Sequence, residues 1–544
     1  MKGTMMHYPL TLMHLLERAG SLYGSVEIVS RMPDKSMHRY TYADFYRRAR
    51  SLAKALQKAG LKRGDRVGTL MWNHYVHLEA YFGIPAAGGV LHTLNLRLHP
   101  DEIAYIANHA GDRFLIVDDV LLPLLQKFRD RLKVERIIVV SLTGQPVPEG
   151  MEEYESFIAE PAEDFVYPDL DEEEAAGMCY TSGTTGRPKG VVYSHRSLVL
   201  HSFASAMADT LGISRHDVVL PVVPMFHVNA WGLPFTCTMV GAKQVFPGPH
   251  LDPVSLLELF KGEQVTFTAG VPTIWLGILQ VLEKNPGQWD LNPKLRMVVG
   301  GAAAPESLIR AFDRHNLRVV HAWGMTETTP LGTVSLLKPH MESLSVDEQY
   351  AYRAKQGLPA PFVEVRIVNE QGVAPHDGKT MGELQVKGPW IAADYYNRPD
   401  SRDSFTEDGW FRTGDVATID PEGFVKITDR TKDLIKSGGE WISSVDLENA
   451  LMGHPAVAEA AVIAVPHPKW QERPLAVVVL KEGARATEEE LIQHLAPRFA
   501  KWWLPDGVVF VEEIPRTSAG KFLKAKLREQ YKDWVKEREG LRPD

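Results

Sequence analysis

A run rich in hydroxyl groups and glycine separates two apolar segments in the first half of the chain. Thr181–Pro188 contains three threonines, one serine and two glycines, and Lys189 and Gly190 then lead into the apolar run Val191–Tyr193. Glycine lets backbone N–H groups approach a ligand closely, the hydroxyls donate further hydrogen bonds, and the basic side chains supply positive charge. The pattern favours a cradle for a polyphosphate, and a nucleoside triphosphate is the natural occupant.

This cradle is not an ordinary P-loop. The Walker motif ends in Gly-Lys-Ser/Thr and opens a helix, whereas here Lys189 precedes Gly190 and a strand-like run follows. A flexible surface loop is the alternative interpretation. It explains a few glycines and hydroxyls, but it explains neither the basic residues Arg187 and Lys189 nor the flanking apolar runs.

A second run of small residues, Gly300–Pro305, lies between a predicted strand and a predicted helix. Tiny side chains at the carboxyl end of a strand leave room for a planar ring, and open α/β sheets bind their ligands at this edge. A tight strand-to-helix turn explains the same residues equally well, so both interpretations stay open at this point.

Tyr180–Gly190 resembles the signature of the adenylate-forming enzymes, which include acyl-CoA synthetases, firefly luciferase and the adenylation domains of peptide synthetases. Together with the motifs below, the resemblance extends from about Thr41 to Lys526, nearly the whole chain. It implies that the cradle binds the phosphates of ATP through Thr181, Ser182, Gly183, Thr184, Thr185, Gly186 and Lys189.

The resemblance also implies an adenine pocket and a metal ligand. His321–Glu327, which follows a predicted strand, resembles the family's aromatic-Gly-x-Thr-Glu motif, with Trp323 in place of the common tyrosine; stacking is kept and a hydroxyl is lost. Glu327 would hold Mg²⁺ with a hydroxyl of Thr181 or Thr184, because magnesium takes hard oxygen ligands and shares them with phosphate. The adenine would be lined by Gly301, Ala302, Ala303, His321, Ala322 and Trp323, with Gly324 and Thr326 in the same motif.

An aspartate and an arginine are implied on the ribose side. Thr413-Gly414-Asp415, expected between two strands, resembles the family's TGD motif, and a carboxylate can accept hydrogen bonds from both ribose hydroxyls. An aspartate in a turn before an apolar strand is a common structural feature, so the tripeptide is weak by itself. The resemblance further implies that Arg430 contacts the nucleotide.

Two more glycine-rich loops are expected near the C-terminus. Lys432–Trp441 forms one, with Lys432, Lys436 and Trp441 expected at the nucleotide, and Pro515–Lys521 forms the other. The second resembles the family's last motif, whose lysine bridges the substrate carboxylate and the α-phosphate. Without this resemblance Lys521 would be read as a solvated surface lysine.

The acyl site is expected at Pro221–Trp231, which is apolar except for His227 and Asn229. The segment lies where the adenylation domains of peptide synthetases carry an aspartate for the substrate ammonium, and this chain has His227 there. A carboxylic acid without an amino group fits better. Trp231 and Trp441 could wall a hydrophobic channel, and plain core packing is the alternative for both.

Composition limits the class of protein. The chain has 544 residues, 44% hydrophobic and 24% charged, and a net charge of −9 gives no support for a nucleic-acid surface. Its two cysteines are too few for a disulfide framework or a zinc site, which favours a reducing cytoplasm. The N-terminus lacks the pattern of a signal peptide, and the lack of a long apolar run excludes a membrane span but not contact with a membrane surface.

The predicted elements describe an α/β protein. It has a large N-terminal domain (1–429) of two layered α/β subdomains plus a small β-barrel, and a smaller, mobile α+β C-terminal domain (430–544). An amphipathic helix is expected over Thr41–Gly60, with Thr41 and Asp44 at its start. The strands expected after it are Arg66–Trp72, Gly88–Leu94, Phe114–Val117, Arg136–Val140, Val218–Val223, Lys243–Phe246, Thr266–Ala269, Arg296–Val299, Arg318–His321, Glu364–Val368, Glu383–Lys387, Trp410–Thr413, Val416–Asp420 and Phe424–Thr428.

The motifs together predict an ATP- and Mg²⁺-dependent ligase that activates a medium- or long-chain fatty acid and transfers it to CoA. Ser443-to-Glu459 and His467-to-Pro474 look like the fatty acyl-CoA branch of the family, which favours this substrate. An aryl-CoA or acyl-carrier-protein ligase is the nearest alternative, and a non-catalytic nucleotide-binding scaffold is the alternative from another class. We expect a homodimer.

Overall fold

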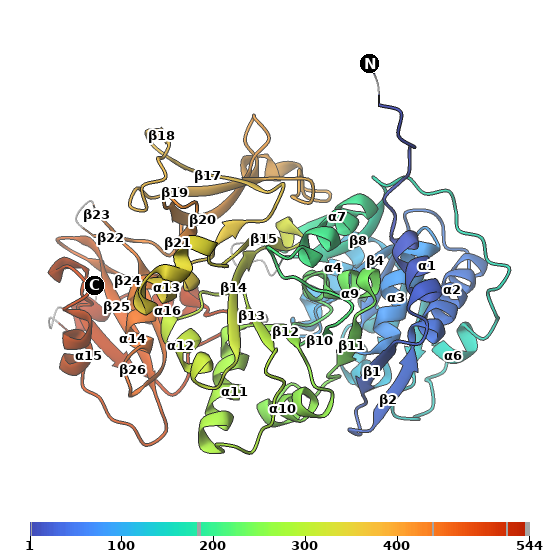
Figure 1. The fold of residues 1–544 in the computed structure, drawn as a ribbon, viewed down its shortest axis with the longest axis horizontal. Helices are drawn as coiled ribbons and strands as arrows, with labels where there is room; N and C mark the ends of the chain where they lie inside the picture. Colours follow the sequence, from blue (N-terminus) through green and yellow to red (C-terminus); the bar gives the residue numbers. More distant parts are fainter. Residues whose placement is uncertain (2, 182–186, 438–439, 518–519, 539–544) are drawn as a thin grey trace.

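The computed structural model describes the chain except for residues 2, 182–186, 438–439, 518–519 and 539–544. The described strands form four sheets. The elements follow one another across the molecule, so that the C-terminal elements (red) lie at the opposite side from the N-terminal helices (blue), with the green and yellow elements between them (Figure 1). The α/β class and the division into a large and a small part are confirmed.

The first sheet has seven strands in the order β7-β6-β5-β3-β4-β8-β9. Its neighbours are parallel except for β8 and β9, which form an antiparallel hairpin on either side of the cradle. The parallel arrangement expected from strand–helix–strand alternation is confirmed. The strands are β3 Arg66–Leu70, β4 Val90–Thr93, β5 Asp112–Asp118, β6 Arg136–Val140, β7 Glu152–Glu153, β8 Ala175–Tyr180 and β9 Gly190–Ser194.

The predicted amphipathic helix is α2 (Tyr42–Lys58). Thr41 and Asp44 form the expected capping box, in which each side chain accepts a hydrogen bond from the other residue's backbone N–H. Its apolar residues at helical spacing, among them Phe45 and Leu52, are fully buried. The other helices around this sheet are α1 Leu12–Leu22, α3 Tyr75–Ala86, α4 Pro100–Ala110, α5 Leu122–Gln126 and α6 Tyr154–Phe157.

The second sheet has nine strands in the order β16-β15-β14-β13-β12-β10-β11-β1-β2. An N-terminal hairpin joins it, because β1 pairs in parallel with β11, a strand more than 200 residues later. The strands are β1 Glu27–Arg31, β2 Met37–Thr41, β10 Val218–Pro221, β11 Lys243–Phe246, β12 Phe267–Gly270, β13 Arg296–Val299, β14 Arg318–Gly324, β15 Leu331–Val334 and β16 Leu358–Pro359. The helices between β9 and β17 are α7 His195–Ala206, α8 Val228–Trp231, α9 Leu233–Val240, α10 Pro253–Gly262, α11 Pro272–Lys284, α12 Glu306–Arg314 and α13 Val346–Arg353.

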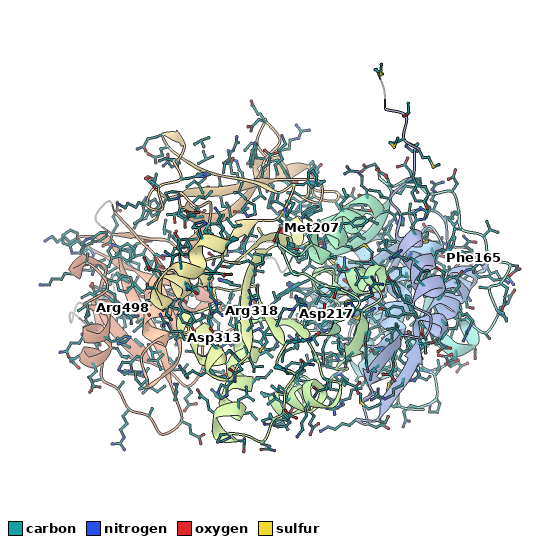
Figure 2. The ribbon with its side chains drawn as sticks, in the orientation of Figure 1. Phe165, Met207, Asp217, Asp313, Arg318 and Arg498 are labelled. Carbon is teal, nitrogen blue, oxygen red and sulfur yellow. The ribbon has the colours of Figure 1, made fainter. Side chains whose placement is uncertain are left out.

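Asp217, labelled in Figure 2, links the beginnings of three neighbouring strands of this sheet through a hydrogen bond and an ion pair. It directly precedes β10, its Oδ1 accepts a hydrogen bond from Thr266 Oγ1 at 2.8 Å, and Arg296 Nη2 lies 2.7 Å from the same oxygen. Thr266 precedes β12 and Arg296 begins β13. These bonds align the strands, so that their carboxyl ends reach one common edge.

The antiparallel region expected after residue 336 forms a five-stranded sheet in the order β18-β17-β19-β20-β21. One detail of the prediction is wrong, because residues 410–420 form a single strand, β20 (Phe411–Ile419), instead of two strands with a turn at Thr413–Asp415. Gly414 has φ +68°, and the pairing jumps from Gln385–Arg412 to Glu383–Val416, as in a β-bulge that absorbs extra residues. The other strands are β17 Glu364–Asn369, β18 Gly372–Val373, β19 Gly382–Lys387 and β21 Val425–Arg430.

The chain passes to the fourth sheet directly after β21. This sheet has the order β23-β22-β25-β24, with β26 beside β25. The expected loop over Lys432–Trp441 contains two of its strands, β22 and β23, and residues 438–439 between them lie outside the described part. The strands are β22 Ile435–Ser437, β23 Glu440–Ile442, β24 Val457–His467, β25 Gln471–Leu480 and β26 Gly507–Phe510. The helices are α14 Ser444–Met452, α15 Glu488–Leu495, α16 Lys524–Gln530 and α17 Trp534–Arg538.

A membrane-spanning helix is not found among the residues that the structure describes, since none of their helices is both long and apolar enough.

Asn73 joins the first two sheets through a buried clasp. Its Nδ2 donates to the carbonyls of Pro221 (3.1 Å) and Val223 (3.0 Å), and its Oδ1 accepts from Met225 N (2.7 Å). The residue is 2% exposed and lies between β3 and α3, whereas its partners are the last residue of β10 and two residues that follow it. Three backbone groups therefore depend on one side chain, and the segment that leads to His227 is held by it.

We expect Asn73→Ala to lower the free energy of unfolding by about 2–4 kcal/mol, because buried backbone groups lose their partners. Denaturant titration measures the change. Asn108→Ala is the matched control, since Asn108 also bonds two backbone groups but does so near the surface; it should cost less than about 1 kcal/mol. Equal losses in the two variants would contradict the clasp.

Candidate active site

A cavity of about 750 Å³ lies beside the carboxyl ends of β13 and β14, the bulge in β20 and the turn that carries Lys521. It brings together residues from all the sequence motifs. Among the predicted site residues, those that line it are Thr181, Lys189, His227, Trp231, Gly301, Ala302, Ala303, His321, Ala322, Trp323, Gly324, Thr326, Glu327, Asp415, Arg430, Lys432 and Lys521.

The cradle connects β8 to β9, the two strands of the antiparallel hairpin. Thr181 N donates to Lys189 O at 2.9 Å, and Lys189 N donates to Thr181 Oγ1 at 3.2 Å, so the two ends of the cradle are joined. Lys189 Nζ lies 4.6 Å from the centre of the Tyr395 ring, which holds the ammonium by a cation–π contact. The predicted phosphate ligands Ser182, Gly183, Thr184, Thr185 and Gly186 lie outside the described residues.

The small residues after β13 make room for a tryptophan of the acyl segment as well as for a ligand. A Cβ on Gly300 would lie 2.9 Å from Cη2 of Trp231, so no larger residue fits there without moving the indole. Trp231 ends a left-handed turn, in which Val228, Asn229, Ala230 and Trp231 have φ of 38°, 55°, 49° and 56°. Such backbone is costly for residues with side chains and is held by its surroundings. The turn sets the direction in which the indole enters the cavity.

Trp323 also lines the cavity and holds the predicted ribose ligand. Its Nε1 donates to Asp415 Oδ2 at 2.9 Å, and Arg430 Nε lies 3.0 Å from Asp415 Oδ1. The end predicted for the strand Arg318–His321 is wrong: β14 continues through Ala322 and Trp323 to Gly324, because β15 pairs with its last residues. The replacement of tyrosine by tryptophan therefore keeps a polar function, since the indole N–H orients a carboxylate.

His321 is bonded to backbone through both ring nitrogens. Nδ1 lies 3.0 Å from Ala354 O and Nε2 lies 3.3 Å from Ala304 N, which assigns the proton to Nδ1. Burial lowers its pKa to about 4, so the ring is neutral. Its main task is to hold the turn after β13, and the ring borders the cavity from that position.

His227 is also neutral. Burial, followed by the charges of Lys521 and Arg97, lowers its pKa to about 4. A neutral imidazole beside two cations has no charge with which to attract a substrate ammonium. This agrees with the expectation of an acid without an amino group.

Glu327 is buried and hydrogen-bonded to a residue that the sequence patterns did not single out. Tyr395 Oη donates to Glu327 Oε1 at 2.5 Å, and Glu327 is 6% exposed. Burial and the Glu327 charge raise the pKa of Tyr395, so its hydroxyl remains a proton donor. The adjacent tyrosines Tyr395-Tyr396 in an otherwise polar stretch are the signal by which this residue could have been found.

Lys521 enters the cavity from the C-terminal part of the chain. Its turn is closed by Thr517 N, which donates to Lys521 O at 2.7 Å, and by Lys521 N, which donates to Thr517 Oγ1 at 3.2 Å. A Cβ on Gly301 would lie 3.9 Å from Lys521 Cε, which places the side chain against the small-residue wall.

The electrostatic surroundings of Lys521 are mixed. Enclosure by protein is the largest influence and lowers the pKa of Lys521 to about 8; Arg430 and Lys432 act in the same direction, and Asp415 and Glu327 oppose them. Around Lys521 the cavity thus combines further cations with the carboxylates of Asp415 and Glu327, an arrangement that can bind a polyanion with a metal and hold a cation beside a reacting phosphate.

Two residues that the sequence predicted at the nucleotide, Lys436 and Trp441, lie outside the cavity in this structure. They face each other across β22 and β23, with Lys436 Nζ 4.7 Å from the Trp441 ring, and Trp441 is 40% exposed. The hairpin turns this pair to the surface because its other face, with Ile435 and Ile442, is buried in the core of the C-terminal part.

This fold and site are those of an adenylate-forming enzyme, and comparison with known proteins agrees. Residues 17–396 match the model of the AMP-binding enzyme family, and residues 446–521 match the AMP-binding enzyme C-terminal domain. The chain belongs to the AMP-binding enzyme family.

Individual relatives match nearly the whole length of this chain. The chain is 57% identical to a long-chain-fatty-acid–CoA ligase of Thermus thermophilus, over 98% of this chain and 97% of the relative. It is 47% identical to a 3-methylmercaptopropionyl-CoA ligase of Ruegeria lacuscaerulensis, over 98% and 99%. Among solved structures, the anthranilate CoA ligase AuaEII in complex with anthranoyl-AMP matches with a TM-score of 0.86 and 26% identity, over 98% of this chain and 100% of that one.

The pKa of Lys521 leads to a pH prediction. If its ammonium is needed, kcat/KM for acid-dependent ATP–pyrophosphate exchange should fall as pH rises through about 8, because the free enzyme loses the proton in that range. Lys521→Arg stays charged, so its profile should lack this limb at whatever rate it retains. The same descending limb in Lys521→Arg would assign the titration to another group.

Proposed function

We propose that this enzyme activates an aliphatic carboxylic acid with ATP and transfers the acyl group to CoA. A carboxylate oxygen attacks the α-phosphorus, the bond to the bridging oxygen breaks, and pyrophosphate leaves. The CoA sulfur then attacks the acyl carbon, the thiol proton is lost, and AMP leaves. The observation that carries the proposal is the presence of Lys521, Glu327 and Asp415 in one cavity, although they come from three different parts of the chain.

The chain's own residues supply positioning and charge. Attack of one anion on another is slow unless the developing charge is neutralised by groups already in place. Lys189 and Lys521 line the cavity from opposite parts of the chain, and Arg430 is held by Asp415. Trp323 and the small residues after β13 give the base a flat site, and the Asp415 carboxylate can accept the ribose hydroxyls.

The donor set fits a magnesium ion that is shared with nucleotide phosphates. Among the described residues there is no cluster of three or more potential protein ligands. Glu327 is a single buried carboxylate oriented by Tyr395, and magnesium is commonly held by one or two carboxylates plus substrate phosphates. Thr181 lines the same cavity, and Thr184 lies outside the described residues. Both hydroxyls therefore stay as alternatives for the second magnesium ligand. When bound, the ion neutralises phosphate charge.

A fatty acid is the substrate class that the acyl side supports. His227 is neutral, and Leu211, Val271 and Leu276 add apolar surface to the cavity that Trp231 also lines. The two relatives named above act on aliphatic acyl groups. The solved anthranilate ligase keeps an aryl-CoA ligase as the second candidate, an acyl-carrier-protein ligase differs only in the thiol, and a non-catalytic scaffold would show no acid-dependent exchange.

The proposal includes a division of the chain at residues 429 and 430 and a movement of the C-terminal part. One position cannot easily supply both a cation for carboxylate attack and an opening for the CoA thiol. A turn at Thr431 and Lys432, within the charged junction Asp429–Asp433, would take Lys521 out and bring the hairpin of Lys436 and Trp441 toward the cavity. Hinges are commonly a few such residues.

Magnesium dependence, a homodimer and a cytoplasmic location complete the proposal. The free thiols Cys179 and Cys237 are buried, which suits a reducing compartment. Light scattering on the purified protein measures the oligomeric state.

We expect acid-dependent ATP–pyrophosphate exchange and CoA-dependent AMP release with acids between C2 and C18, strongest for medium or long chains and weak for benzoate. Trp231→Ala should change the relative kcat/KM along this panel by about tenfold, the scale of a few methylenes in an apolar pocket, with little effect on KM for ATP. An unchanged chain-length preference in Trp231→Ala would mean that Trp231 only packs in the core. A preference of the parent enzyme for amino acids or benzoate would reject the fatty-acid assignment.

Glu327→Gln keeps the shape of the side chain and removes its charge. It should lower the adenylation rate by about 10²–10³ and raise the Mg²⁺ concentration needed for half activity. Glu383→Gln is the matched control, because this carboxylate also borders the cavity but is directed to Arg412. Normal Mg²⁺ dependence in Glu327→Gln, or the same shift in both variants, would reject the metal assignment.

A further inference from the structure

Strand β21 is fastened to the first turn of α14 by three contacts. Ser443 Oγ donates to Thr428 O, Ser444 N donates to Asp429 Oδ2 at 2.8 Å, and Lys426 Nζ lies 2.9 Å from Asp446 Oδ1. β21 belongs to the five-stranded sheet and α14 to the C-terminal part. Asp429 is 1% exposed, whereas the Lys426 side chain is 41% exposed. Two of these contacts are therefore buried, and of these two only the one made by Asp429 uses a side chain of β21.

Ser444 connects this contact to the turn of Lys521. Its backbone N–H is bonded to Asp429, and its hydroxyl accepts a hydrogen bond from Lys524 Nζ at 2.6 Å. Lys524 Nζ also lies 2.7 Å from Glu448 Oε1. Lys524 begins α16 and stands three residues after Lys521. A carboxylate on β21 is thus linked through one serine and one lysine to the turn that carries Lys521.

The charges in this chain of contacts are buried and interdependent. Burial raises the pKa of Asp429, and burial raises the pKa of Glu448 to about 7, while Lys524 opposes both shifts. Burial disfavours the Lys524 charge, but attraction by Glu448 and Asp429 outweighs it and raises the pKa of Lys524. A buried charge that loses its partner is strongly destabilising. Lys524 keeps Glu448 within the C-terminal part, whereas Asp429 Oδ2 has its partner Ser444 N only while α14 packs on β21.

We propose that Asp429 is a positioning residue that holds Lys521 in the cavity by way of Ser444 and Lys524. The inference rests on the proposed function. If the C-terminal part turns at Thr431 and Lys432, Asp429 stays with β21 while Ser444, Lys524 and Glu448 leave with α14. The contact is then broken before thioester formation and remade before the next adenylation.

The test uses a distance reporter that needs no substrate. Lys284 Nζ at the end of α11 lies 3.7 Å from Glu482 Oε2 after β25, and the two side chains are 72% and 94% exposed. Fluorophores on Lys284→Cys and Glu482→Cys would show high energy transfer in this arrangement and lower transfer after a turn; the native cysteines are buried. Such an exposed ion pair contributes little, so its replacement should not itself move the equilibrium.

In the labelled protein, Asp429→Asn should raise the ratio of low- to high-transfer molecules about tenfold, the scale of weakening one charge-assisted hydrogen bond. Asp420→Asn is the matched control. Asp420 is a buried carboxylate in the turn between β20 and β21 that accepts hydrogen bonds from Glu422 N and Phe424 N and contacts Lys355, all within the N-terminal part. It should leave the ratio unchanged.

The second readout separates the half-reactions. Asp429→Asn should slow acid-dependent ATP–pyrophosphate exchange and spare thioester formation from supplied acyl-adenylate. Ser444→Ala keeps the N–H bonded to Asp429 but removes the acceptor of Lys524, so it should slow exchange with an unchanged transfer ratio. An unchanged ratio in Asp429→Asn, a tenfold rise in Asp420→Asn as well, or equal losses in both half-reactions would overturn the inference. Absence of exchange in the parent protein with every acid would instead reject the proposed function, while the transfer ratio still decides the contact.

Discussion

The placement of the Lys521 ammonium inside an enclosed cavity is the constraint on which the rest of the structure depends. Enclosure and the neighbouring Arg430 disfavour its charge, while Asp415 and Glu327 favour it. Each carboxylate is in turn held by a partner from a different segment, Asp415 by Trp323 and Glu327 by Tyr395. A cation that is only partly stabilised in the free enzyme is well suited to a polyanionic ligand, which supplies the missing negative charge when it binds.

The scaffold around this lysine combines aligned strands with two irregular segments at the cavity. Parallel strands end at a common edge, and Asp217 and Asn73 fix the alignment of the sheets at some distance from the chemistry. The two irregular segments are the left-handed turn that ends at Trp231 and the bulge at Gly414. Both re-aim a side chain into the cavity, and both are held by packing that the local sequence does not supply.

Sequence reasoning succeeded where a local pattern has a local cause. The helix that begins after Thr41 follows from its capping box and the spacing of Phe45 and Leu52, and the parallel strands follow from short apolar runs that alternate with helices. It failed where the ends of a strand are set by pairing with another strand that the local pattern does not reveal. Pairing with β15 extends β14 through Ala322–Gly324, and pairing with β19 makes β20 continuous through the TGD motif. Neither motif therefore lies in a loop, as its residues had suggested.

By itself, the sequence determined the family, the order of the motifs and most of the residues that meet in the cavity, because these follow from residue types at fixed spacing. Only the tertiary structure decided which of them meet at the same time. It places Lys521 inside the cavity and the pair Lys436 and Trp441 at the surface, although all three lie in the same C-terminal part. The physical reason is that a rigid domain presents one face at a time, and the buried contact of Asp429 with α14 selects which face that is.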